Sequence, residues 1–448
     1  MTQDLIWALT AQPEQAADFI LLTKCFDMAP QAPKSSTPAS ATQANGQAPQ
    51  GWGDKVRPGL TYDDVLLLPN YSETLPRNVD VSTELAPGFR LNVPLVSAAM
   101  DTVTEYQLAI AMAAEGGMGF LHKNMSVEKQ ADQVRRVKRY ESGLIVDPIT
   151  LSPEAPLREA FRLMQEYKIG GIPITDGNRK LVGIITNRDI RFQEPSDRPI
   201  GEVMTREQLV TVPEGTTLDE SVEVLTQHRI EKLPVVDKQS RLVGLVTYKD
   251  ILKRKSFPSA NKDNLGRLRV GAALGITPDI LDRLEALMAA GADAITIDTA
   301  HAHSKGVLDN VKLIRQKYPD LPLVVGNVGV AAGARAVLEA GASSVKVGIG
   351  PGSICTTRIV TGVGVPQLSA IMECSAVARE FGASLIADGG IRYSGDIPKA
   401  IAAGADIVMA GNLFAGTEES PGETILFEGR KFKSYRGMGS LEAMSEGS

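Results

Sequence analysis

Eight short apolar runs, separated by stretches with helical periodicity, restrict the folds open to this 448-residue chain more than any other feature. Continuous apolar runs of this kind are typical of parallel strands that are buried on both faces. Strands that alternate with helices pack in layers, and eight such pairs can close into a barrel. The sequence therefore predicts an α/β fold of the (β/α)8 barrel type. The predicted strands are Val93–Ser97, Gly117–Leu121, Arg269–Ala273, Ala294–Asp298, Leu321–Gly326, Ser344–Val347, Ser384–Ala387 and Ile407–Ala410.

An internal repeat lies between the second and third predicted strands. Its landmarks recur at a constant offset, so that Pro173 and Pro234 are 61 positions apart. A constant offset indicates a duplicated supersecondary unit. Each copy has two β-branched runs with a turn between them, preceded by amphipathic helices predicted over Leu157–Lys168 and Leu218–His228. The repeat pair is therefore predicted to be an insertion in the barrel.

These patterns divide the chain into an extension, a barrel in two parts and an insertion. Within the extension, a short helix is predicted around Asp4–Phe26, and residues 29–52 are rich in Pro, Ala, Gln, Ser and Thr, which is typical of a disordered linker. The predicted units are residues 1–52 for the extension, 53–145 for the first barrel part, 146–255 for the insertion with copies at 146–200 and 205–255, and 256–448 for the second barrel part.

Composition excludes several classes of partner. The 47 basic and 53 acidic residues give a net charge of −6, which offers no general attraction to nucleic acid or to an anionic membrane. The apolar run Phe19–Leu22 is too short to span a membrane. Three scattered cysteines, at positions 25, 355 and 374, do not form a disulfide framework or a metal cluster. A reducing cytoplasm is the expected setting.

The segment Gly348–Arg358 carries the most specific chemical signal. Its glycines allow positive φ and a close approach of the backbone to a ligand, so that amides and carbonyls can hold an anion or a cation. Cys355 lies inside this loop, where backbone dipoles and Arg358 favour a nucleophilic thiolate. A glycine-rich turn with a structural cysteine is the alternative interpretation.

The candidate residues fall after predicted strands, where barrel enzymes keep their chemistry. Those that end or follow a strand are Met100, Asp298, Asn327, the Cys355 loop, Asp388 and Gly411.

Several motifs in a fixed order resemble the inosine-5′-monophosphate (IMP) dehydrogenase family. The resemblance extends from about residue 58 to residue 448. The similar segments are Leu60–Pro69, Ser97–Val103, His122–Ser126, Gly348–Gln367, Ala387–Arg392 and Tyr435–Ser440. The resemblance implies oxidation of IMP to xanthosine 5′-monophosphate with NAD, the committed step toward guanine nucleotides.

The resemblance also implies roles for individual residues. Cys355 forms the covalent adduct and Thr357 lies near the attacking water. No Gly-x-Gly-x-x-Gly supports a separate Rossmann domain. The resemblance implies that Asp298 and Asn327 lie near the nicotinamide end of NAD. A potassium ion is expected at the backbone carbonyls of Gly350, Gly352 and Cys355.

For the substrate, the resemblance implies contacts to phosphate, ribose and base. Asp388 is expected to accept hydrogen bonds from both ribose hydroxyls. Asn412 departs from the serine expected there, although an amide can still donate to phosphate. The implied substrate residues are Ser353, Gly390, Gly411, Asn412 and Tyr435 for phosphate, and Met100, Gly437, Met438 and Gly439 around the base.

The inserted repeats resemble a pair of cystathionine-β-synthase (CBS) motifs, a Bateman module. The resemblance implies ATP or GTP at ribose-contacting positions, namely Thr186 with Asp189 and Thr247 with Asp250. A purely structural repeat pair is the alternative.

Three functions remain open from the sequence: the dehydrogenase, a guanosine monophosphate (GMP) reductase, and a catalytically weak nucleotide sensor. The pair His301 and His303 suggests a metal site, which no cysteine or carboxylate spacing supports. The resemblance also implies a homotetramer.

After Tyr435–Ser440, family members continue into a flap that carries an Arg-Tyr pair and then into a last barrel helix. We therefore expect the chain to be truncated and hydrolysis of the adduct to be slowed.

Overall fold

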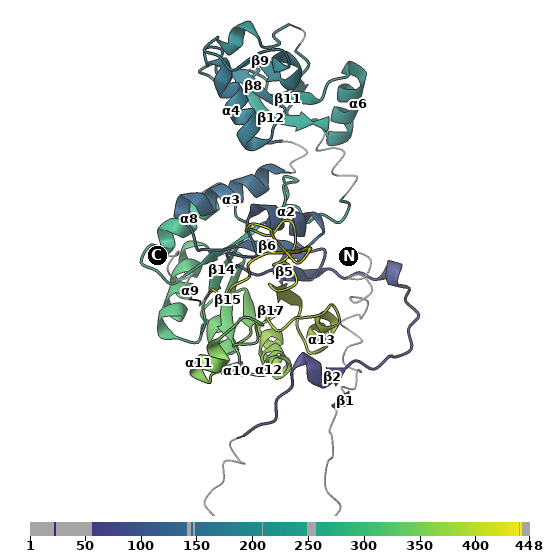
Figure 1. Cartoon of the computed structure of the whole chain (residues 1–448), viewed down its shortest axis with the longest axis vertical. Coiled ribbons are helices and arrows are strands. Elements are labelled where there is room, and N and C mark those ends of the chain that lie inside the picture. Colours follow the sequence, from purple (N-terminus) through teal and green to yellow (C-terminus); the bar gives the residue numbers. More distant parts are fainter. Residues whose placement is uncertain are drawn as a thin grey trace, which may run out of the picture.

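The core of the structure is a closed barrel of eight parallel strands (Figure 1). This computed structural model describes residues 22–23, 56–140, 145–146, 148–207, 209–248, 257–438 and 440. Going around the barrel, the strands are β13 (Gly271–Leu274), β14 (Ala294–Asp298), β15 (Leu323–Val328), β16 (Ser344–Val347), β17 (Ser384–Asp388), β18 (Ile407–Ala410), β5 (Leu95–Ser97) and β6 (Met118–Leu121). All eight predicted strands are confirmed, with small shifts at their ends.

Two of those shifts have one physical cause. The strands predicted from Val93 and Leu321 begin two residues later, at Leu95 and Leu323. Each skipped segment contains a proline, Pro94 or Pro322. Proline lacks the N–H that a central strand donates to its neighbour, so both strands begin just after it.

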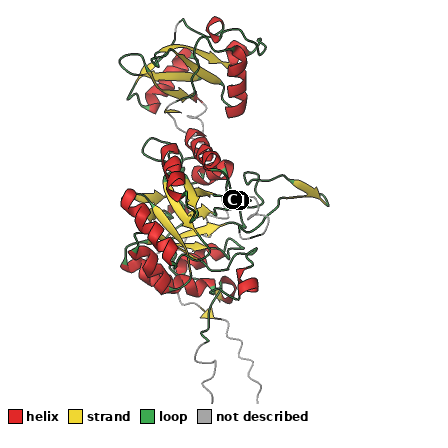
Figure 2. Ribbon diagram, turned by 90° about the vertical axis from the view of Figure 1, so that its left-hand side faces the viewer, coloured by secondary structure: helices red, strands yellow, loops and turns green. Residues whose placement is uncertain are grey.

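Helices cover the outside of the barrel, as Figures 1 and 2 show. They are α2 (Tyr106–Ala114), α3 (Val127–Tyr140), α8 (Ile280–Ala290), α9 (Lys305–Lys317), α10 (Ala331–Glu339), α12 (Gln367–Glu380) and α13 (Asp396–Ala402), with the short α11 (Thr357–Thr361) in the loop after β16. Their buried faces form the larger hydrophobic cluster between helices and strands.

A second cluster fills the barrel interior. Met118, Phe120, Ile386 and Met409 contribute to it from the strands. The hairpin of β3 (Thr83–Ala86) and β4 (Phe89–Leu91) adds buried residues at one end of the barrel, where Ser384 Oγ donates to the Glu84 carbonyl over 2.6 Å. The other end, at the carboxyl termini of the strands, is thereby left for ligands.

The insertion folds as the predicted duplicate, which Figure 1 shows above the barrel. In each copy a helix precedes an antiparallel hairpin. The elements are β7 (Ile145–Val146), α4 (Leu157–Tyr167), β8 (Gly171–Thr175), β9 (Leu181–Thr186), α5 (Asn187–Ile190), the 3₁₀ helix η5 (Ile200–Glu202), β10 (Val212–Pro213), α6 (Leu218–His228), β11 (Lys232–Val236) and β12 (Leu242–Thr247).

Two hydrogen bonds join the copies symmetrically. Leu181 N donates to Ser240 O over 3.0 Å, and Leu242 N donates to Arg179 O over 2.9 Å. The two donors are equivalent residues in the repeat, as are the two acceptors. The copies are therefore related by a pseudo-two-fold axis through this contact.

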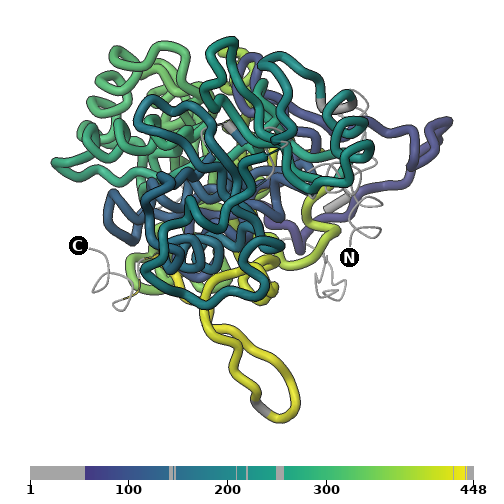
Figure 3. The backbone as a smooth tube through the Cα atoms, turned by 90° about the horizontal axis from the view of Figure 1, so that it is seen from above, coloured from purple at the N-terminus to yellow at the C-terminus, as the bar shows by residue number. Residues whose placement is uncertain are grey.

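Smaller elements complete the fold. The 3₁₀ helices η3 (Tyr62–Asp64) and η4 (Pro76–Asn78) precede the barrel, and β19 (Ile425–Phe427) pairs with β20 (Arg430–Phe432) in a hairpin that extends from the body in Figures 2 and 3. Most of the predicted helix at residues 4–26 lies outside the described residues. At Leu22 and Thr23 the helix prediction is wrong, because β1 (Leu22–Thr23) pairs antiparallel with β2 (Val65–Leu66).

Candidate functional site

The carboxyl ends of the barrel strands collect the predicted site residues. Asp298 and Asp388 end β14 and β17, and Asn327 lies in β15. Met100 follows β5 and Gly411 follows β18. Because all eight strands are parallel, these ends share one face of the barrel, as the sequence predicted.

The Cys355 loop follows β16 on this face. Cys355 is a free, half-buried thiol whose Sγ lies 3.2 Å from the Thr357 hydroxyl. The Cys355 N–H donates to the Gly352 carbonyl over 3.0 Å, which forms a tight turn. Arg358 is directed elsewhere than the sequence suggested: its guanidinium donates to the Val365 carbonyl over 2.5 Å. It therefore fastens the loop, because the guanidinium donates to two backbone carbonyls, those of Ile349 and Val365.

The Cys355 loop is packed directly against the loop that carries Asp388. A Cβ atom added to Gly348 would lie 2.0 Å from the Asp388 carbonyl oxygen, and one added to Gly389 would lie 2.8 Å from Pro351. Gln367 joins the two loops, because its Nε2 donates to Val347 O over 2.9 Å and to Asp388 O over 3.2 Å. Both loops need glycine for this approach.

A second group of predicted residues surrounds Tyr435. A Cβ atom on Gly411 would lie 3.0 Å from the Tyr435 hydroxyl and 3.1 Å from Met100 Sδ. Ser353 forms a hydrogen bond with the Tyr435 hydroxyl, and burial raises the pKa of Tyr435 to about 12. The tyrosine therefore remains a donor at neutral pH.

The neighbouring segment joins this group to the Cys355 loop. A Cβ atom on Gly437 would lie 3.5 Å from the Ile354 carbonyl, and Met438 Sδ lies 3.4 Å from Asp101 N. Asn412 is exposed beside Gly411. Gly390 takes a φ of 81° next to the buried ring of Tyr62. Gly439 lies outside the described residues.

A charged pair that the sequence motifs do not reveal adjoins this segment. Arg436 Nη2 donates to Asp101 Oδ2 over 2.7 Å, and Asn124 Nδ2 donates to the same oxygen over 3.0 Å. Burial alone would raise the pKa of Asp101, but the hydrogen bonds from Arg436 and Asn124 outweigh it and lower the pKa. Asp101 therefore stays ionised and holds Arg436 in place.

Lys346, in the middle of the apolar strand β16, is a further site residue that the motifs do not reveal. The side chain is 2% exposed. Its Nζ lies 2.7 Å from Asp298 Oδ1 and 2.6 Å from Asp388 Oδ2, and it also donates to Asn327 Oδ1. Burial alone would lower the pKa of Lys346, but the two carboxylates outweigh it and raise the pKa. The sequence signal that could have revealed Lys346 is a charged residue within an otherwise apolar predicted strand.

The histidine pair lies between β14 and α9. The rings of His301 and His303 are 6.2 Å apart between centroids. Within the part of the chain that the structure describes, no group of three or more His, Cys, Asp or Glu residues is placed to hold a metal ion. Within the same residues, no helix is long and apolar enough to cross a membrane.

The structure brings together the predicted nucleotide residues of the first repeat copy. Asp189 Oδ2 accepts from the Thr186 hydroxyl over 2.6 Å, and Asp189 Oδ1 accepts from the Thr205 hydroxyl over 2.9 Å. The Asp189 carboxylate thus caps the short helix α5. Thr247 ends β12 as Thr186 ends β9, and its predicted partner Asp250 is outside the described residues.

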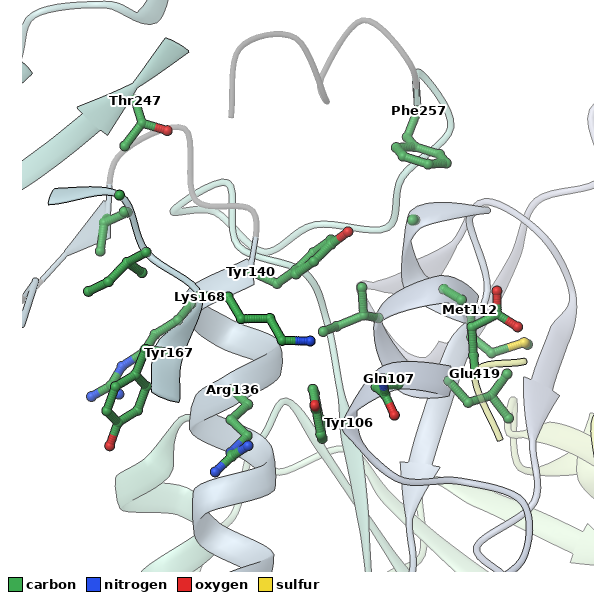
Figure 4. Close-up of a pocket in the computed structure, with 18 of the residues that line it drawn as sticks. Tyr106, Gln107, Met112, Arg136, Tyr140, Tyr167, Lys168, Thr247, Phe257 and Glu419 are labelled. Atoms are coloured by element: carbon green, nitrogen blue, oxygen red, sulfur yellow. The ribbon is translucent and has the colours of Figure 1, made fainter. Parts of the chain in front are cut away.

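Thr247 lines a cavity of about 940 Å³ between the insertion and the barrel (Figure 4). Tyr106, Arg136 and Tyr140 line it from α2 and α3, and Lys168 from the residue after α4. This cavity is separate from the strand ends where Cys355 and Asp388 lie.

Comparisons with known proteins agree on one family. The sequence profile of the IMP dehydrogenase / GMP reductase domain matches residues 59–448. The chain is similar to IMP dehydrogenases from Aquifex aeolicus (59% identity over 393 residues, 87% of this chain and 80% of that protein) and Halalkalibacterium halodurans (58% over 398 residues, 89% and 82%). Its structure is similar to GMP reductase from Trypanosoma brucei with bound guanosine 5′-monophosphate (TM-score 0.83, 40% identity, 88% of this chain and 84% of that one). The same enzyme with guanosine 5′-triphosphate gives a TM-score of 0.78 at 40% identity, covering 82% and 89%.

Proposed function

The chain belongs to the IMP dehydrogenase / GMP reductase family and is an NAD-dependent IMP dehydrogenase, and from this premise we propose how its residues oxidise IMP to xanthosine 5′-monophosphate. One observation carries the proposal. Gln367 and the glycine contacts hold the Cys355 loop against the Asp388 loop, which supports a single substrate site shared by the two loops.

In the first step, the Cys355 thiol loses its proton and the sulfur adds to C2 of the purine base of IMP. The C2 hydrogen leaves with its electron pair as a hydride, which reduces NAD to NADH. Water then attacks C2, and the carbon–sulfur bond breaks as a new carbon–oxygen bond forms. The sulfur regains a proton and xanthosine 5′-monophosphate is released. Thr357, whose hydroxyl lies 3.2 Å from Cys355 Sγ, is suited to orient that water.

The remaining residues bind the two substrates. Asp388 accepts hydrogen bonds from the ribose hydroxyls. The phosphate is bound by Ser353, Gly390, Gly411 and Tyr435. The contact of Gly411 with both Tyr435 and Met100 supports this arrangement, because it brings the phosphate and base residues together. Asn412 adds an amide donor, and Gly437, Met438 and Gly439 line the base. Asp298 and Asn327 bind the nicotinamide end of NAD.

A potassium ion fits the loop around Cys355. Gly350 takes a φ of 74°, which allows its carbonyl to point into the loop. The Gly352 carbonyl accepts one hydrogen bond from Cys355 and keeps a second lone pair. Backbone carbonyls are the ligands that bind K⁺ in proteins. The carbonyls of Gly350, Gly352 and Cys355 would hold the ion, which when bound keeps the loop in shape.

The insertion acts as a CBS pair that binds ATP or GTP. Its pseudo-two-fold symmetry supports two equivalent positions, at Thr186 with Asp189 and at Thr247 with Asp250. The insertion and the barrel both line one cavity. A nucleotide bound to the insertion would therefore change the contacts that α2 and α3 of the barrel make at this cavity.

The chain assembles as a homotetramer. The projecting hairpin β19–β20 supports assembly, because Leu426 is 71% exposed on it and Ile425 is also exposed. A reducing cytoplasm is the proposed location, since Cys355 must remain a free thiol to act.

The decisive experiment compares two reactions of the purified chain. NADH should form from IMP and NAD, and Cys355→Ser should abolish this while retaining IMP binding. Oxidation of NADPH with GMP, in the absence of any IMP-dependent NADH formation, would instead identify a GMP reductase.

A further inference from the structure

Lys346 occupies the centre of the site although it carries no role in the reaction described above. Its ammonium has three N–H donors, and three site residues accept them: Asp298, Asn327 and Asp388. These acceptors come from β14, β15 and β17, so Lys346 on β16 joins four neighbouring strands. Asn327 Nδ2 also donates to Asp388 Oδ2 over 2.9 Å, which closes the network.

The fold makes room for this side chain. A Cβ atom on Gly326 would lie 2.6 Å from Lys346 Cβ and 2.9 Å from the Lys346 carbonyl oxygen. The lack of a side chain at Gly326 therefore lets β15 and the lysine lie side by side. Lys123 is directed to the same place, where its Nζ donates to the Asp298 carbonyl over 2.8 Å.

A stable barrel does not require a lysine here. Replacing a buried ion pair by apolar side chains is often neutral or stabilising, because the desolvation cost of the charges disappears. The other residues of β16 are uncharged and equally buried. The charge is therefore explained better by its partners, which are the carboxylates that the proposed function assigns to IMP and to NAD.

We propose that Lys346 is a positioning residue that couples the IMP site to the NAD site through Asp388 and Asp298. Its ammonium neutralises the repulsion between two carboxylates that both lie within hydrogen-bond distance of it, and so keeps Asp388 directed toward the ribose and Asp298 toward the dinucleotide. The inference rests on the proposed assignment of those two carboxylates to substrate and cofactor.

The test replaces the charge with an apolar side chain of similar length. IMP binding to the full chain is measured by calorimetry for Lys346→Met, together with thermal unfolding. The affinity should fall about tenfold or more, the size of effect expected when a hydrogen bond to a charged group is lost. Lys346→Gln, which retains polar atoms, provides a second variant if Lys346→Met does not fold.

The chain offers a matched control in Lys138. This lysine is 4% exposed and also bridges two aspartates, with Nζ 3.0 Å from Asp263 and 2.6 Å from Asp293. It lies on α3, away from the Cys355 loop. Lys138→Met should affect thermal unfolding but leave IMP affinity unchanged.

A second-site variant separates positioning from a merely structural role. In the double variant Lys346→Met with Asp298→Asn, one of the two like charges is gone, so IMP affinity should recover relative to Lys346→Met. The single variant Asp298→Asn serves as the reference. Unchanged IMP affinity in a folded Lys346→Met or Lys346→Gln would overturn the inference, as would a double variant that binds IMP no better than Lys346→Met. Failure of the unmutated chain to bind IMP would instead overturn the proposed function on which the inference rests.

Discussion

Arg436 and Asp101 are 335 positions apart in the chain, yet Arg436 Nη2 donates to Asp101 Oδ2 over 2.7 Å. Asp101 directly follows Met100, and Arg436 directly follows Tyr435. The pair therefore joins the loop after β5 to the segment proposed to bind the base and phosphate. Backbone contacts support the same junction, since Arg436 N donates to the Thr102 hydroxyl over 3.3 Å.

Asp101→Asn should raise the KM for IMP about tenfold, because Arg436 loses a hydrogen bond to a charge worth roughly 1.5–3 kcal/mol. The pKa of Asp101 is lowered in the folded chain, so its stabilising contribution is present above the ordinary aspartate value near roughly 3.9 and is lost as pH falls through the lowered pKa. Steady-state kinetics at neutral pH checks the first point. A KM for IMP equal to that of the unmutated chain would show that Arg436 does not position the segment.

The two described cysteines should react differently with iodoacetamide. Burial raises the pKa of Cys374 to about 12, so it remains an unreactive thiol at neutral pH. Cys355 is only half-buried at the site. Peptide mass spectrometry should find Cys355 alkylated first, and saturating IMP should protect it. Preferential labelling of Cys374, or no protection by IMP, would count against Cys355 as the nucleophile.

Tyr435→Phe should lower IMP affinity about tenfold through the loss of a donor to phosphate. Burial raises the pKa of Tyr435 to about 12, above the ordinary tyrosine value of roughly 10. The hydroxyl therefore stays protonated at neutral pH, and its hydrogen bond to the phosphate is lost only as the pH rises through the raised pKa. The ratio of the two affinities should therefore be constant between about pH 7 and 9. A ratio that collapses within this range would contradict the assignment.

Two glycine substitutions should have opposite effects on thermal unfolding. Gly326→Ala places a methyl group 2.6 Å from Lys346 Cβ and should destabilise the chain by about 1–3 kcal/mol, with loss of IMP binding. Gly306→Ala lies on helix α9, where an added Cβ meets nothing within 4 Å, and should stabilise by up to about 1 kcal/mol. If both substitutions shifted thermal unfolding equally, the space beside Lys346 could hold a methyl group without strain.

Replacing residues 146–255 by a short linker should leave the barrel folded, because the strands on either side of the insertion pair directly, with Gly271 opposite Phe120. IMP-dependent NADH formation should continue, while any response to ATP or GTP should disappear. Activity assays with and without each nucleotide provide the measurement. If ATP or GTP still changes the activity after the deletion, the regulatory nucleotide binds to the barrel and not to the insertion.

The strands could be predicted from the sequence because each is a continuous apolar run whose periodicity is local. Ala294–Asp298, Ser344–Val347 and Ile407–Ala410 are predicted to the residue. The starts of β5 and β15 were missed, although Pro94 and Pro322 would have located them. The strand at Leu22–Thr23 could not be predicted, because its partner lies more than forty positions away at Val65–Leu66.

The same distinction separates the two kinds of site residue. Gly350, Gly352 and Cys355 stand in one contiguous segment, so a motif could reveal them. Gln367, Arg436 and Lys346 act through partners that only the closed barrel brings near. Lys346 in particular reads as an interruption of an apolar strand until Asp298 and Asp388 are placed on either side of it.

The position of the insertion has a consequence for synthesis of the chain on the ribosome. β6 ends at Leu121 and its neighbour β13 begins at Gly271, about 150 residues later, while the other partner of β5 is β18. At roughly 5–20 residues per second, the edge of β6 waits on the order of ten to thirty seconds for its partner. Unpaired edges of apolar strands promote aggregation. The repeat pair can fold during that interval, whereas β5 and β6 still lack their barrel neighbours, so we expect these two strands to need protection by chaperones.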